Sequence, residues 1–198
     1  SKKKASNITV RKRLWIENPV NQKMLANFSE GYGGDISEAI EHEIALAKKA
    51  IGEFVHKHHI DVIIAHNTAH PDNFILSVAL HRYYRDAMAN KERTPKYVLW
   101  WHDSHLERNF YSNPANDVQR YLVQGVPGKF VEYIIFINSL QFQEAESYFR
   151  KIDELDPGFY DYIYKNHTMI YNTTDIFIDS FSDLVSDKFN SRVQKFLD

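Results

Sequence analysis

The sequence predicts an α/β domain with a doubly wound, mostly parallel sheet, and two patterns indicate this fold class. Four short apolar runs are continuous rather than alternating, as in strands that are buried on both faces. Longer segments with helical periodicity separate these runs, and crossovers of such length connect parallel strands with a right-handed turn. The length of 198 residues suits one domain.

Composition excludes several classes of function. Hydrophobic residues make up 43% of the chain, with 7 glycines and 6 prolines, which is typical of a globular protein. The net charge of -2, with both signs mixed, gives no basic field for nucleic acid. The lack of cysteine excludes disulfides and Cys-ligated zinc. No apolar run approaches the roughly 20 residues of a transmembrane helix, so we expect a cytoplasmic protein.

The first 36 residues are less regular than the rest. Residues 8–16 (ITVRKRLWI) are a candidate for a further strand, and residues 27–35 (NFSEGYGGD) indicate a flexible loop. The first clear helix covers residues 37–56, with Asp35 or Ser37 as its N-cap. Its apolar stripe consists of Ile40, Ile44, Ala47, Ile51 and Val55, and we expect this stripe to pack on the sheet.

Two more helices alternate with the apolar runs. Residues 74–88 are apolar around most of the circumference and follow the helix-start residues Pro71 and Asp72, so we expect a helix enclosed on more than one side, with His81 in the core. A third helix follows Asn138 and ends before Asp156. The expected strands are residues 61–65 (DVIIA), 97–101 (YVLWW), 133–137 (YIIFI) and 168–171 (TMIY). Residues 1–175 should form one Rossmann-like domain, and residues 176–198 a connection with a short helix.

Polar residues follow each expected strand. Because parallel strands point the same way, their carboxyl ends share one edge of the sheet, where ligands bind in open α/β sheets. The residues in question are His66 and Asn67, His102 and Asp103, Asn138 and Ser139, and Asn172, Thr173 and Asp175. For Asn67, Asn138 and Ser139 the alternative is a cap of the next helix or loop. The coincidence of polar residues at all four strand ends favours a polar crevice.

One segment in this crevice admits a metal-site hypothesis. AHPDN, at residues 69–73, resembles the AHPDD signature of zinc-dependent deacetylases acting on N-acetylglucosaminyl substrates, in which a His and an Asp bind the ion and the next Asp is the base. His70, Asp72 and one further His would supply the three ligands of a catalytic zinc. Asn73 stands in the place of this base and cannot act as one. We therefore expect no metal, and a deacetylase-like hydrolase using His70 and Asp72 is an alternative.

A second resemblance extends over more of the chain. DVIIAHN, HPDNFILSVALHRYYRD, YVLWWHDSH, YIIFINSLQFQEAESYF and MIYNTTD, in this order, resemble the N-terminal half of family-4-like glycosyltransferases of the GT-B fold, over roughly residues 61–175. The resemblance implies transfer of a hexosyl group from a nucleotide diphosphate sugar to an unknown acceptor, with retention and without a metal or a permanently bound cofactor. It implies that His102 is catalytic and contacts the transferred sugar near the anomeric carbon.

The same resemblance implies the remaining site residues and a partner. His66, Asn67, Asn73, Asp103 and His105 would line the acceptor side, while Asn138, Ser139 and Asn172 match further substrate-binding positions. In that family a C-terminal GT-B domain holds the nucleotide with basic residues and paired glutamates, and nothing after Asp175 matches these. We therefore expect an acceptor-side domain that is inactive alone. A non-catalytic α/β binding module is a further alternative.

Overall fold

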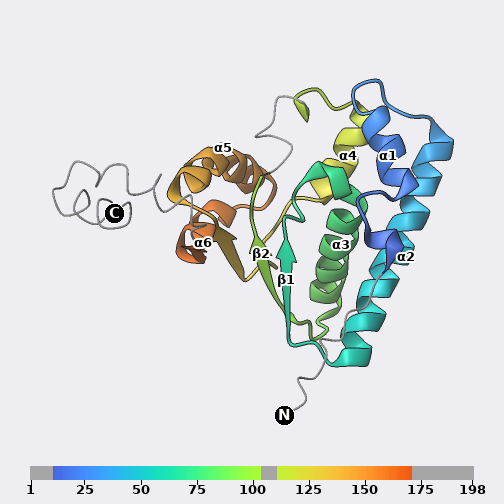
Figure 1. Cartoon of the computed structure of the whole chain (residues 1–198). Helices are drawn as coiled ribbons and strands as arrows, with labels where there is room; N and C mark the ends of the chain where they lie inside the picture. The colour runs from blue at the N-terminus through green and yellow to red at the C-terminus, as the bar shows by residue number, and fades with distance from the viewer. Residues whose placement is uncertain (1–10, 104–110, 171–198) are drawn as a thin grey trace, which may run out of the picture.

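The computed structural model describes residues 11–103 and 111–170 of the chain (Figure 1). The strands are β1 (Val62–His66), β2 (Lys96–Trp100), β3 (Tyr133–Phe136) and β4 (His167–Met169). The α-helices are α1 (Pro19–Ala26), α2 (Gly34–His58), α3 (Phe74–Asn90), α4 (Asn116–Gln124), α5 (Ser139–Leu155) and α6 (Phe159–Lys165). Two short 3-10 helices, η1 (Lys12–Leu14) and η2 (Pro71–Asn73), precede α1 and α3.

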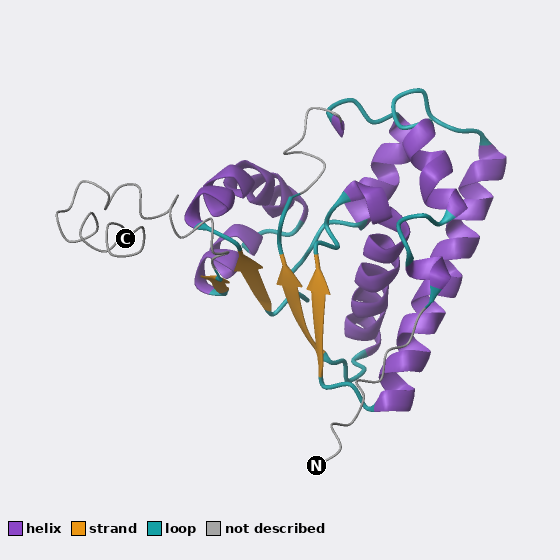
Figure 2. Ribbon diagram, in the orientation of Figure 1, coloured by secondary structure: helices purple, strands orange, loops and turns teal. Residues whose placement is uncertain are grey.

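The four strands form one parallel sheet in the order β1-β2-β3-β4 (Figure 2). Ile64 of β1 lies opposite Val98 of β2, which lies opposite Tyr133 of β3. All four strands were predicted from their continuous apolar runs to within about two residues, the usual uncertainty of element ends. The prediction of a parallel α/β sheet is therefore confirmed.

The helices lie on one face of this sheet. Tyr97 of β2 stacks on Tyr84 of α3, with ring centroids 4.8 Å apart. Trp101, on the same face by the two-residue alternation of a strand, packs against Phe149 of α5 at 5.1 Å. The apolar stripe of α2 was expected to pack on the sheet. Instead, α2 packs mainly against α3. On the opposite face, Ile64 is 61% exposed.

Within the described residues the sheet is therefore not doubly wound, contrary to the prediction. In the order β1-β2-β3-β4 each new strand is added on the same side of the previous one. Because crossovers between parallel strands are right-handed as a rule, repeated steps in one direction place the connecting helices on one face. Continuous apolar runs indicate buried strands but do not carry the strand order. On the uncovered face, residues of these runs are exposed, for example Val62 and Tyr133.

The three predicted helices are present, with corrections at their ends. The N-cap of α2 is Gly33, in an extended conformation, and Asp35 lies in the first turn, so the predicted caps were wrong. Glycine is accepted at an N-cap, and an acidic residue stabilises the first turn through the helix dipole. Helices α1, α4 and α6 were not predicted. Residues 11–16 of the candidate first strand include η1, whereas residues 8–10 and the expected tail at 176–198 lie outside the described ranges.

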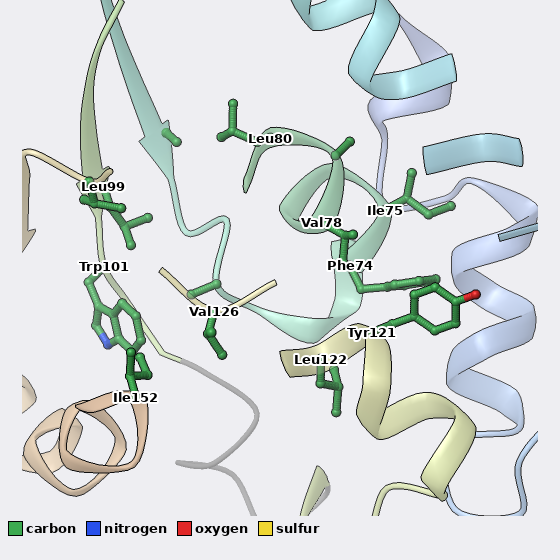
Figure 3. Packing of buried hydrophobic residues seen from close by; sticks show 14 of the residues in the cluster. Phe74, Ile75, Val78, Leu80, Leu99, Trp101, Tyr121, Leu122, Val126 and Ile152 are labelled. Atoms are coloured by element: carbon green, nitrogen blue, oxygen red, sulfur yellow. The ribbon is translucent and has the colours of Figure 1, made fainter. Parts of the chain in front are cut away.

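A series of buried hydrogen bonds crosses the core between α3 and β2. Figure 3 shows Phe74, Leu122 and Trp101 in the hydrophobic interior, to which α3, α4 and the end of β2 contribute. His81, fully buried as predicted, has Nε2 2.9 Å from the Tyr97 hydroxyl, which lies 3.1 Å from the Thr68 hydroxyl. Because buried polar groups are costly unless hydrogen-bonded, these hydrogen bonds fix the loop after β1 to the core.

Acid is expected to destabilise the fold through His81. Burial, with a smaller effect of the Arg85 guanidinium, lowers the pKa of this imidazole from 6.5 to about 3. Below about pH 6.5 the unfolded chain binds a proton at His81 that the folded chain does not bind. The contribution of His81 to the free energy of unfolding is therefore fully present above about pH 6.5 and is lost as pH falls toward about 3. In urea unfolding, His81→Gln should flatten this dependence by up to about 1.4 kcal/mol per pH unit.

His58→Gln is the matched control, because His58 lies exposed at the end of α2. That variant keeps His81 and should therefore retain the loss of stability in acid that His81 causes. Identical pH slopes for His81→Gln and the wild type would contradict the assignment to His81.

Candidate functional site

The carboxyl ends of β1, β2 and β3 lie in register at one edge of the sheet. His66 pairs with Trp100, and the Asn67 backbone N–H donates to the Trp100 carbonyl at 2.8 Å. The Trp101 N–H in turn donates to the Ile135 carbonyl at 2.8 Å. The polar residues that follow these strands are therefore carried to the same edge, as the sequence predicted.

Two imidazoles meet at this edge. Nε2 of His102 lies 3.1 Å from Nε2 of His66, and the ring centroids are 4.5 Å apart. At this distance one Nε2 carries the hydrogen and the other accepts it. The His66 ring also lies 5.8 Å from the indole of Trp100. The pair thus presents one donor-acceptor unit beside an aromatic ring.

A second layer lies beside the imidazole pair. The Asn67 side chain donates to Oδ1 of Asp103, and the Asp103 backbone N–H donates back to the Asn67 side-chain oxygen, both at 3.3 Å. Asn67 has a left-handed backbone (φ 53), which asparagine tolerates better than most residues. Nε2 of His70 lies 3.5 Å from Oδ1 of Asp103, whose side chain is only 12% exposed. His70 and Asp103 therefore join Asn67 in one polar cluster.

The AHPDN segment holds a turn. His70 is the N-cap of η2, where Nδ1 accepts from the Asp72 backbone N–H at 3.2 Å. The Asp72 carboxylate accepts a hydrogen bond from the Tyr111 hydroxyl. Among the residues that the structure describes, no three His, Asp or Glu side chains are grouped to hold one metal ion. The described residues therefore form no ligand set for the zinc site of the deacetylase hypothesis.

Asn138 and Gln141 tie the ends of β2 and β3 together. The Asn138 side chain caps α5 by accepting from the Gln141 N–H at 2.7 Å. The Gln141 side chain accepts from the Ile137 N–H at 2.9 Å and donates to the His102 carbonyl. Sequence reasoning missed Gln141, although a Gln three residues after an Asn N-cap is close to a capping box. This amide fixes the backbone that carries His102.

The remaining predicted residues have different surroundings. The Asn73 side chain accepts from the Asn21 amide at 3.0 Å and donates to the Leu14 carbonyl at 2.9 Å, so it anchors the segment before α2. Ser139 is the first residue of α5 and is partly exposed. The predicted residues His105 and Asn172 lie outside the described ranges.

A groove of about 460 Å³ opens beside His66, along β1 and α2. This volume lies within the roughly 300–1,000 Å³ of small-molecule pockets. Its lining is mostly apolar and includes Trp15, Phe54, Ile64 and Leu76. The carboxyl edge therefore combines polar groups with a neighbouring apolar surface.

Comparisons of the chain with protein-family models, with curated proteins and with solved structures found no match. In the described part of the chain, the helices are too short or too polar to cross a bilayer.

The role of Asn138 as a helix cap can be measured. Asn138→Ala removes the acceptor of the Gln141 N–H and should lower the free energy of unfolding by about 1 kcal/mol. Asn138→Ser restores a strong N-cap and should recover most of this loss in denaturant unfolding. Equal stability of the wild type and Asn138→Ala would show that the cap contributes nothing.

Proposed function

We propose that this chain is the acceptor-side domain of a glycosyltransferase, which transfers a hexosyl group from a nucleotide diphosphate sugar to an acceptor hydroxyl, with His102 as the catalytic residue. The observation that carries the proposal is the contact of His66 and His102 at the carboxyl edge of the sheet. Parallel α/β sheets bind their ligands at this edge. The order of the motifs along the chain adds the resemblance to the N-terminal half of GT-B enzymes.

The chemistry of the cluster suits a polyhydroxyl ligand. Each sugar hydroxyl donates one hydrogen bond and accepts others, and neutral imidazole offers both functions. Asp103, the residue after His102, adds a carboxylate acceptor that contacts His70 and Asn67, and bonds of hydroxyls to charged groups are the stronger ones. The apolar groove beside His66 would receive a less polar part of the acceptor.

In the proposed reaction, the bond from the anomeric carbon to the diphosphate oxygen breaks and a bond to the acceptor oxygen forms. The diphosphate leaves with the bonding electrons, and the acceptor hydroxyl passes its proton to the departing diphosphate oxygen. His102 would hydrogen-bond the transferred sugar near the anomeric carbon, where charge develops in the transition state. In GT-B enzymes the nucleotide is held by a second domain, which we propose as the partner of this chain.

Turnover is expected to depend on His102. In the full-length natural protein, His102→Ala should lower kcat by roughly 100-fold, the scale of losing one hydrogen bond to a developing charge. Release of nucleoside diphosphate from a panel of sugar nucleotides measures this loss. His42→Ala is the control, because His42 lies exposed on α2.

The two variants should fold equally well, as judged by circular dichroism and urea unfolding. Near-normal turnover of His102→Ala would remove the catalytic role from this residue. If the wild-type protein transfers no sugar, the non-catalytic binding module becomes the better description of the chain.

A further inference from the structure

We propose that His70 is a positioning residue, which orients the Asp103 carboxylate to accept a hydrogen bond from a substrate hydroxyl. This inference rests on the proposed function and deepens it. It assigns a role to the histidine of the AHPDN segment, for which the described residues form no zinc ligand set. The positioning role depends on which nitrogen of His70 carries the hydrogen.

Hydrogen bonding sets the tautomer of His70. Nδ1 lies 3.2 Å from the Asp72 backbone nitrogen, which is a donor, and 3.6 Å from Oδ2 of Asp72, so the nearer N–H makes Nδ1 the acceptor in the neutral ring. The hydrogen of neutral His70 must then sit on Nε2, which faces Oδ1 of Asp103 at 3.5 Å. A single backbone N–H thus turns the imidazole into a donor aimed at the carboxylate.

The ring of His70 is also held from the side. Tyr111 meets it edge-on, with ring centroids 5.7 Å apart and an interplanar angle of 89°. The Tyr111 hydroxyl donates to the carboxylate of Asp72, whose N–H holds Nδ1. The imidazole is 15% exposed, so little water competes for these contacts. The orientation of His70 is therefore fixed before any ligand binds.

Asp103 is held at Oδ1 from two directions. Asn67 donates to this oxygen at 3.3 Å, and His70 approaches it at 3.5 Å. Two contacts on one oxygen fix the rotation of the whole carboxylate, because both oxygens share a rigid plane. The residue directly follows His102, so a fixed carboxylate beside the proposed catalytic imidazole would select one orientation of the bound sugar.

Two isosteric variants separate positioning from simple loss of structure. His70→Gln keeps an N–H donor near the place of Nε2, whereas His70→Asn keeps a polar group near Nδ1 but does not reach Asp103. In the full-length protein, His70→Asn should lower kcat/KM about ten-fold, the scale of one hydrogen bond to a charged group. His70→Gln should recover most of kcat/KM. Equal losses in both variants would overturn the proposal.

A second measurement does not depend on turnover. Nitrogen-15 NMR of the histidine-labelled chain, at a pH above the usual imidazole titration range, should show His70 protonated at Nε2 and bare at Nδ1. Asp103→Asn should shift the Nε2 resonance of His70 and leave that of exposed His42 unchanged. Protonation at Nδ1 would overturn the positioning role while the transferase proposal stands. If His70 shows the expected tautomer but the natural protein transfers no sugar, the catalytic role of His102 and the positioning role of His70 are both overturned. Only the contact between His70 and Asp103 then stands.

Discussion

The one-way alignment of β1, β2 and β3 is the constraint on which the candidate site depends. His66 and His102 are 36 positions apart in the sequence, and their Nε2 atoms lie 3.1 Å apart because parallel strands in register end at the same edge. An antiparallel β2 would carry His102 to the opposite edge. Gln141 extends the constraint to β3, since its amide bonds the backbone at both strand ends.

The core reinforces this alignment from one face of the sheet. Tyr97 stacks on Tyr84 of α3 and also joins Thr68 to His81 through its hydroxyl. Thr68 follows Asn67, so the loop that carries the polar cluster is fixed to the buried aromatic layer. Burial of the rings provides the driving force, and the hydrogen bonds specify the register of the loop. The opposite face of the sheet stays partly exposed, as at Ile64.

Sequence reasoning predicted what depends on local pattern. The continuous apolar runs gave the four strands, and the strand ends then placed His66 and His102 at one edge, because parallel strands leave no other choice. The side of the sheet that each helix covers depends on strand order, which periodicity does not carry. Helix α4 was missed, although it buries Val118 and Tyr121, because nine residues give only a brief stripe. Asn138 matched its alternative reading as a helix cap, whereas the Gln141 side chain bridges two strand ends that only the fold brings together.

The site is thus built from two linked layers, an exposed imidazole pair and a carboxylate set by His70 and Asn67. The most direct test of the account is a nuclear Overhauser measurement between the imidazole protons of His66 and His102 in the histidine-labelled chain. Ring centroids 4.5 Å apart predict a strong cross-peak between the two rings. Its absence, with both resonances assigned and the chain folded, would contradict the convergence of the two strand ends and the sugar-transfer proposal with it.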